Sequence, residues 1–102
     1  MTSVLLVGKR PISIDEARVA LDRPDVELRV AFDLEEVRAA FATGPIAHVV
    51  MGGGLPLDDR LAVVRAVFEL SESTTVHMKD RHTGPEGYVP FVRRVVRGLL
   101  SG

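Results

Sequence analysis

Two lysines, the only ones in the chain, each follow an apolar run that is typical of a buried β-strand. Lys9 comes directly after residues 3–8, and Lys79 ends the run 74–79. In a parallel α/β sheet the carboxyl ends of the strands open onto one edge, where ligands usually bind. An ammonium group at that edge can hold a phosphate or a carboxylate by a charge-assisted hydrogen bond. The placement of the two lysines therefore indicates a site for an anion.

Three successive glycines, Gly52, Gly53 and Gly54, follow the apolar run 46–51 and precede the start of a helix. Glycines in this position can turn their backbone amides toward an anion at the amino end of the helix. They can also make a tight turn with positive φ, which glycine adopts without steric cost. The turn is the commoner use of such a run, and the two lysines add weight to the anion interpretation.

Two arginines enlarge the cationic group, because Arg10 follows Lys9 and Arg81 lies just beyond Lys79. Few local acids, chiefly Asp80, are available to offset these charges, so a bound anion would relieve their repulsion. The residues predicted to bind an anion are Lys9, Arg10, Gly52, Gly53, Gly54, Lys79 and Arg81.

Three residues near the end of the run 74–79 are candidates for proton transfer: His77, Asp80 and His82. Asp80 and His82 have the chemistry of an acid–base or metal-binding pair. No third ligand accompanies them, so no metal site is predicted, and a hydrogen bond within the loop is the simpler interpretation. For His77 the simpler interpretation is a contact on an edge strand.

The elements that must position these residues follow from the hydrophobic periodicity, which alternates between short apolar runs and amphipathic stretches in the order βαβαβαβα. Strands are expected near residues 3–8, 26–32, 46–51 and 74–79. Helices are expected over residues 13–23, 33–44, 56–70 and 88–100. Ser13 with Glu16, and Asp33 with Glu36, have the pattern of capping boxes at helix starts.

The helical stretches also indicate which side chains share a face. Leu61, Val64 and Phe68 lie on one face of the third helix, and Val89, Val92, Val96 and Leu99 are expected to face inward on the last. Arg93, Arg94 and Arg97 fall away from that stripe and are expected to form a solvated surface.

The first and third strands are the most apolar and belong at the centre of the sheet, although the third contains His48, which we expect to be buried and hydrogen-bonded. Val26–Val30 alternates apolar and charged residues and looks like an edge strand. With right-handed crossovers the simplest strand order is 2-1-3-4 in an all-parallel sheet. The sequence therefore predicts a three-layer α/β/α domain with a flavodoxin-like arrangement. Its switch point lies between the first and third strands, next to Lys9 and the glycines.

This pattern resembles the receiver domain of two-component response regulators. The stretch Val76-His77-Met78-Lys79 and the later stretch 89–96 are similar to the last strand and helix of that family, and Lys79 matches its lysine on the last strand. Receivers carry an acidic pair after the first strand, where this chain has Gly8-Lys9, and a phosphoacceptor aspartate at the end of the third, where it has Met51-Gly52. The resemblance therefore implies a degenerate, phosphate-independent member.

Composition restricts the function further. The chain has 102 residues, 46% of them hydrophobic, which suits one domain spanning 1–102. A formal net charge of −1 gives no basic field for nucleic acid, and no apolar stretch approaches the ~18 residues of a membrane span. The chain has no cysteine, which fits a reducing cytoplasm and removes thiolate chemistry. Neither a dinucleotide fingerprint nor a phosphate-binding loop of the P-loop type is present, so no cofactor is predicted.

Two classes of function agree with these features. The favoured one is a nonenzymatic ligand-binding or regulatory module, similar to a receiver without its phosphoacceptor. The alternative is a small enzyme or sensor acting on an anionic metabolite, with His77 or His82 moving protons. A homodimer is expected, because the strand 74–79 carries little besides Lys79 to prevent its exposed edge from pairing; the contact would use that edge or the final helix.

Overall fold

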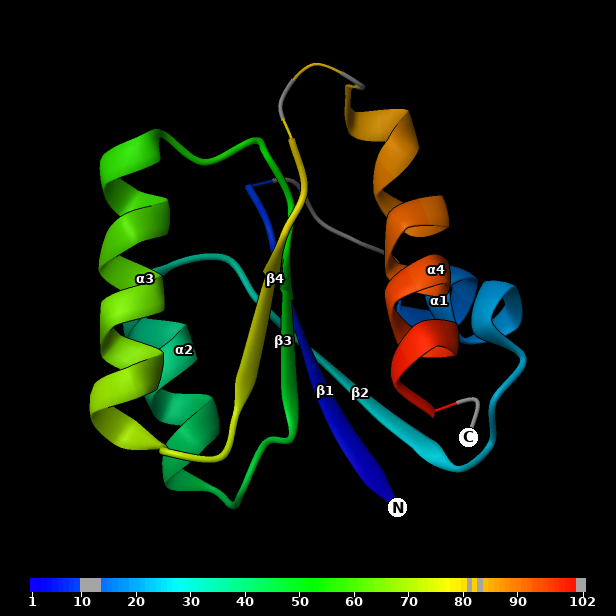
Figure 1. Cartoon of the computed structure of the whole chain (residues 1–102), viewed down its shortest axis with the longest axis horizontal. Coiled ribbons are helices and arrows are strands. Elements are labelled where there is room, and N and C mark those ends of the chain that lie inside the picture. Colours follow the sequence, from blue (N-terminus) through cyan, green and yellow to red (C-terminus); the bar gives the residue numbers. More distant parts are fainter. Residues whose placement is uncertain (10–13, 81, 83, 101–102) are drawn as a thin grey trace.

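The computed structural model describes residues 1–9, 14–80, 82 and 84–100. Four parallel strands form one sheet in the order β2-β1-β3-β4 (Figure 1). The strands are β1 Thr2–Val7, β2 Val26–Ala31, β3 His48–Met51 and β4 Thr75–Met78. The predicted fold class, a three-layer flavodoxin-like α/β/α arrangement with this strand order, is confirmed.

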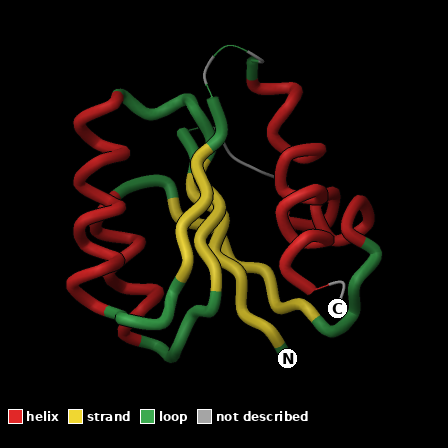
Figure 2. Tube along the Cα trace, viewed as in Figure 1, coloured by secondary structure: helices red, strands yellow, loops and turns green. Residues whose placement is uncertain are grey.

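Four helices cover the two faces of the sheet. They are α1 Ile14–Leu21, α2 Leu34–Ala42, α3 Leu57–Leu70 and α4 Tyr88–Leu100, and a short 3₁₀ turn, Pro85–Gly87, precedes the last. The helices α2 and α3 lie on one side of the sheet, and α1 and α4 lie on the other (Figure 2). None of the helices in the described part of the chain combines the length and apolar character needed to cross a bilayer.

Alternation along the central strands builds a core on each side of the sheet. Val4 and Leu6 of β1 pack with Val50 of β3 under α1 and α4. The intervening Leu5 and Val7 pack under α2 and α3, in the same cluster as Met51. Because β1 is buried on both faces, its apolar run has no polar interruption.

The start of α2 confirms the predicted capping. The Asp33 side chain accepts a hydrogen bond from the Glu36 amide at 2.8 Å. The Glu36 carboxylate in turn accepts the Phe32 amide at 2.8 Å, one residue earlier than in the standard box. The other predicted cap includes Ser13, which lies outside the described residues.

The two long helices bury only part of their apolar residues. Leu61 and Phe68 do share a face of α3, but their side chains are 52% and 55% exposed. The face of α3 that meets the core is formed by smaller residues and one arginine: Arg60, Val63, Ala66 and Val67. On α4 the expectation that Leu99 faces inward is wrong, because its side chain is 37% exposed.

Candidate functional site

The carboxyl ends of the strands bring three of the predicted segments together. Val7, Met51 and Met78 are in register across β1, β3 and β4. The Gly52 amide donates to the Val7 carbonyl at 2.8 Å, and the Lys79 amide donates to the Met51 carbonyl at 2.8 Å. Lys79 and Gly52 therefore lie side by side where the sheet ends, at the upper edge in Figure 1.

Lys9 reaches the same edge through the glycine loop. A Cβ placed on Gly54 would lie 3.3 Å from the Lys9 Cβ, so the loops after β1 and β3 are in close contact. The Lys9 side chain is exposed. The structure thus brings Lys9 and the glycine loop together, as the sequence predicts. Arg10 and Arg81, the other two predicted cations, lie outside the described residues.

Lys79 is the buried cation at this edge, with only 4% of the residue exposed. Its ammonium group donates to the Asp80 carbonyl at 2.9 Å. No ion pair among the described residues involves Lys79 or Lys9. A buried cation is costly unless an opposite charge or several hydrogen bonds compensate for lost hydration. An anion placed at the carboxyl edge would supply that compensation.

The glycine run serves neither of its two predicted purposes at Gly52. Its amide is used by the Val7 carbonyl, so it is not available to an anion. Neither Gly52 nor Gly54 has the positive φ that the tight-turn interpretation requires. Gly52 packs beside the ring of Tyr88, and an added Cβ would lie at an ordinary van der Waals distance of 3.6 Å from that ring. Gly54 allows the close approach of Lys9.

Tyr88 of α4, which the sequence did not single out, lies against the ends of β1 and β3 at the switch point of the sheet. Its hydroxyl donates to the Val50 carbonyl at 2.6 Å and to the Val7 carbonyl at 3.2 Å, so it joins the ends of β3 and β1. Burial raises the pKa of Tyr88 well above its ordinary value, because the phenolate would lose its hydration. The hydroxyl therefore stays protonated and acts as a structural donor. The only available signal was that this is the single tyrosine of the chain, at the first position of a predicted helix.

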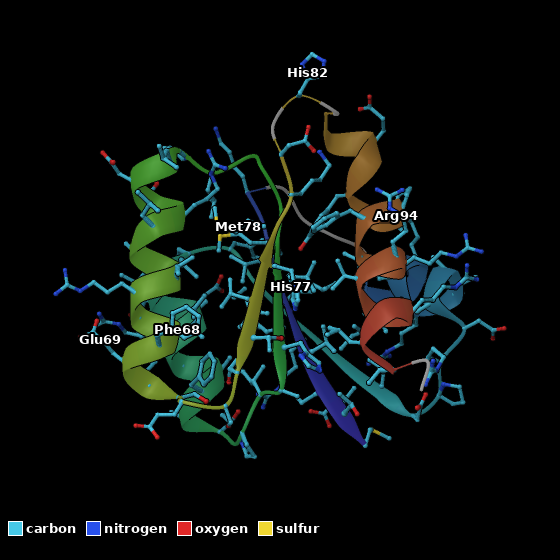
Figure 3. All side chains as sticks on the ribbon, viewed as in Figure 1. Phe68, Glu69, His77, Met78, His82 and Arg94 are labelled. Carbon is cyan, nitrogen blue, oxygen red and sulfur yellow. The ribbon has the colours of Figure 1, made fainter. Side chains whose placement is uncertain are left out.

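His77 is part of a short polar cluster on β3 and β4, below the carboxyl edge (Figure 3). The Thr75 hydroxyl lies 2.6 Å from His48 Nδ1 and 2.9 Å from His77 Nε2, so it joins the two imidazoles. The ring centroids are 6.3 Å apart. Burial, and after it the charge of His77, lower the pKa of His48. His48, which was expected to be buried and hydrogen-bonded, is thus half-buried, and its hydrogen-bond partner is Thr75.

The remaining candidates for proton transfer do not join this cluster. His82 lies at the tip of the loop after β4, where its exposed side chain points away from the sheet (Figure 3). Asp80 is exposed and directly follows Lys79. Within the described residues, no three histidine, aspartate or glutamate side chains gather as metal ligands. The structure therefore separates His77, in the middle of a strand, from His82.

Comparison of the chain with protein-family models, with curated proteins and with solved structures found no significant match.

Proposed function

We propose that this protein is a nonenzymatic binding or regulatory module, similar to a receiver without a phosphoacceptor, that takes up a small anion at the carboxyl edge of its sheet. The observation that supports this proposal is the buried Lys79, whose ammonium group makes no ion pair with another described residue. Lys9, beside the glycine loop, adds a second cation that can move toward a ligand because it is exposed.

The arrangement of acids and bases favours binding over catalysis. A general acid or base must lie within hydrogen-bond reach of the reacting group. His77 instead contacts Thr75 in the middle of β4, and His82 points away from the edge. The alternative, a small enzyme or sensor acting on an anionic metabolite, predicts turnover that is lost in His82→Ala or His77→Ala. Phosphoester hydrolysis with that loss would replace our proposal.

Localisation and oligomeric state are part of the same proposal. We propose a cytoplasmic homodimer, since the chain has no cysteine and one edge of its sheet carries no charged side chain. The nearly neutral net charge of −1 does not favour nucleic acid as the ligand.

Thermal unfolding in phosphate or sulfate, against chloride of equal ionic strength, tests the anion site. An anion at tenfold excess over its Kd stabilises the folded state by about 1.4 kcal/mol, which raises Tm by roughly 5–10 °C for a domain of this size. We expect this rise to shrink in Lys9→Ala and to vanish in Lys79→Met, which keeps the length of the side chain.

Arg38→Ala is the matched control, because it removes an exposed cation from the middle of α2. It should keep the full rise in Tm. Equal stabilisation of the parent, Lys79→Met and Arg38→Ala by phosphate would show that the ions act through general salt effects, and the proposed site would be wrong.

A further inference from the structure

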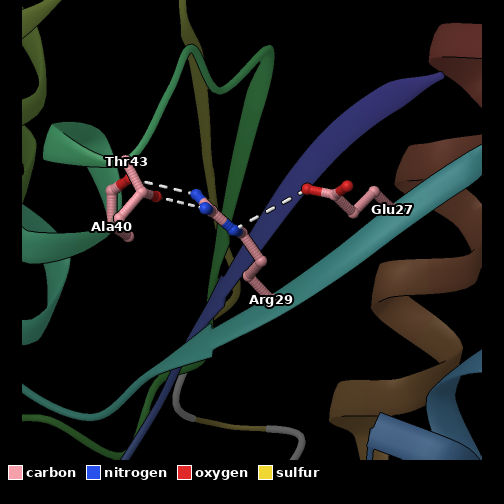
Figure 4. Close-up of polar contacts among 4 residues, drawn as sticks. All are labelled: Glu27, Arg29, Ala40 and Thr43. Carbon is pink, nitrogen blue, oxygen red and sulfur yellow. Dashed lines mark hydrogen bonds and ion pairs between the residues drawn. The ribbon is translucent and has the colours of Figure 1, made fainter.

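The two edge strands of the sheet differ in the charged side chains that they carry. The β2 edge carries charged residues: Arg29 Nε lies 3.7 Å from the Glu27 carboxylate (Figure 4). The same guanidinium donates to the Ala40 carbonyl at 3.0 Å and to the Thr43 hydroxyl, which ties the end of α2 to this strand. Charged side chains of this kind are a common means of preventing another strand from adding to an edge.

The β4 edge has no such protection. Its residues 75–78 include no charged side chain. The amides of Thr75 and Lys79 bond to β3, at 3.1 Å and 2.8 Å from the carbonyls of Ala47 and Met51. Because backbone groups alternate along a strand, the N–H and C=O groups of Val76 and Met78 point away from the sheet. Figure 1 looks onto this edge, with β4 in front of β3.

An apolar surface lies beside the bare edge. Leu57, Leu61, Val64 and Phe68 follow one another along α3 at helical spacing, and Met78 adds to them from β4. We call these five residues the α3–β4 surface. Leu57, Leu61 and Phe68 are 54%, 52% and 55% exposed, and Met78 is 37% exposed. Phe68 and Met78 lie on the side of the molecule on which β4 forms the edge (Figure 3).

We propose that a second copy of this chain docks here, with the β4 strands of the two copies antiparallel around a twofold axis. This inference rests on the proposed homodimer and specifies its interface. A twofold axis normal to the sheet makes the strands antiparallel and keeps α3 of both copies on the same face. The α3–β4 surface of one copy then contacts the same surface of the other copy.

The register follows from the backbone groups that point outward. Pairing is complete when Val76 of each copy exchanges both hydrogen bonds with Met78 of the other. The axis then passes between the two copies of His77, which form a pair without hydrogen bonds between their backbones. The same symmetry makes the two α3 helices antiparallel, so the amino end of one lies toward the carboxyl end of the other.

The charges beside the apolar stripe agree with this arrangement. Asp58 and Arg65 are seven positions apart on α3, so both flank the stripe on its solvent side. In an antiparallel pair of α3 helices, Asp58 of one copy lies near Arg65 of the other. Arg65 is 83% exposed and is therefore able to reach across.

The exposed area has the size that a stable dimer needs. Leu57, Leu61, Phe68 and Met78 are 37–55% exposed, which corresponds to roughly 100 Å² each, or on the order of 400 Å² of apolar surface per copy. A standard interface buries about 800 Å² per partner, and about 60% of that area is apolar. The α3–β4 surface supplies most of this apolar part, and strand pairing adds polar contacts. The final helix is a poorer candidate, because its outer face carries Arg93, Arg94 and Arg97, all exposed.

Sedimentation equilibrium over a concentration series tests the interface. Leu61→Asp would place two like charges in the contact, so we expect the dimer dissociation constant to rise at least about a hundredfold. Met78→Pro removes an outward amide, leaves the bonds to β3 intact, and should have a similar effect. Val19→Asp on α1 is the matched control, since Val19 is 80% exposed on the opposite side of the sheet, and we expect a change below about threefold.

A cysteine cross-link tests the register in the same solutions. The chain contains no cysteine, so His77→Cys introduces a single thiol. Residues paired without backbone hydrogen bonds have Cα atoms about 4.5 Å apart, which is within the range of a disulfide. Mild oxidation should therefore give a covalent dimer of His77→Cys, and Val19→Cys should form no covalent dimer under the same conditions.

Each outcome decides between the proposals. A parent protein that stays monomeric at high micromolar concentration would refute the homodimer, and with it this interface. A dimer that survives both Leu61→Asp and Met78→Pro would uphold self-association but refute this surface. Circular dichroism of each variant shows whether it is folded, and the cross-link remains informative if one substitution prevents folding. The anion test is separate, because Lys79 belongs to the carboxyl edge.

Discussion

Replacing Tyr88 by phenylalanine removes one hydroxyl and keeps the ring that packs against Gly52. The lost hydroxyl donates to the Val50 carbonyl at 2.6 Å and to the Val7 carbonyl at 3.2 Å. The Val7 carbonyl keeps its hydrogen bond from the Gly52 amide at 2.8 Å, so it is not left without a donor. A net intramolecular hydrogen bond contributes about 0.5–1.5 kcal/mol. We therefore expect Tyr88→Phe to lower the free energy of unfolding by about 1 kcal/mol.

Urea unfolding followed by circular dichroism at one protein concentration measures this change. Fluorescence is unsuitable, because Tyr88 is the only tyrosine and the chain has no tryptophan. The slope of free energy against urea should stay constant, and Tm should fall by roughly 4–8 °C. Tyr88→Ala, which also removes the ring, should cost about 3–5 kcal/mol. The reasoning fails if Tyr88→Phe is within about 0.3 kcal/mol of the parent, or if it is as damaging as Tyr88→Ala.

Two further predictions concern glycines and pH. Gly52→Ala should leave the free energy of unfolding in urea nearly unchanged, since the φ of Gly52 is not positive and the nearest contact of an added Cβ is an ordinary 3.6 Å. Gly84 has a φ of +76°, and a Cβ added there would lie 2.9 Å from the Glu86 carboxylate, so Gly84→Ala should lower the free energy of unfolding by about 1–2 kcal/mol. Equal losses would refute the assignment of a glycine-dependent backbone conformation to Gly84 but not to Gly52. The lowered pKa of His48 means that the unfolded chain binds the proton of this residue more tightly, so the shift has no effect on stability well above the ordinary pKa of 6.5 and destabilises the fold as pH falls below that value. Unfolding measured across that range should depend less on pH in His48→Asn, and an unchanged dependence would show that another group is responsible.

The fold was predictable because its strongest signals are local and repeated. The apolar run of β1 has no polar residue because both of its faces are covered, and the charges of Glu27 and Arg29 marked β2 as an edge. Register at the carboxyl edge then followed from topology, which is why Lys9 and Lys79 were placed correctly at the ends of their strands. Strand limits differ from prediction by at most two residues, since 46–51 shortens to His48–Met51.

The interactions of Tyr88 were not predictable, because they depend on contacts between residues far apart in the chain. Its hydroxyl bonds to backbone carbonyls 81 and 38 positions away, and a backbone carbonyl leaves no recognisable pattern in the sequence. The same holds for Gly52, whose amide bonds to the distant Val7 carbonyl. A glycine of this kind looks, in sequence, the same as a glycine in a turn or in an anion-binding loop.

The exposure of the apolar stripe on α3 was not predictable either, and it bears on the proposed dimer. Periodicity locates an apolar stripe but does not say whether the core or a partner covers it. Arg60 is only 8% exposed and donates to the Leu55 carbonyl at 3.0 Å, so the start of α3 is fixed with this residue inward. Leu61 and Phe68 must then lie beside the core-facing stripe and remain about half exposed. Turning the helix to bury them would expose Val63 and Val67 and break the contact of Arg60. A helix held in this orientation by a buried guanidinium, with its largest apolar residues turned toward the one uncharged edge of the sheet, has the form of an interface rather than of a packing defect.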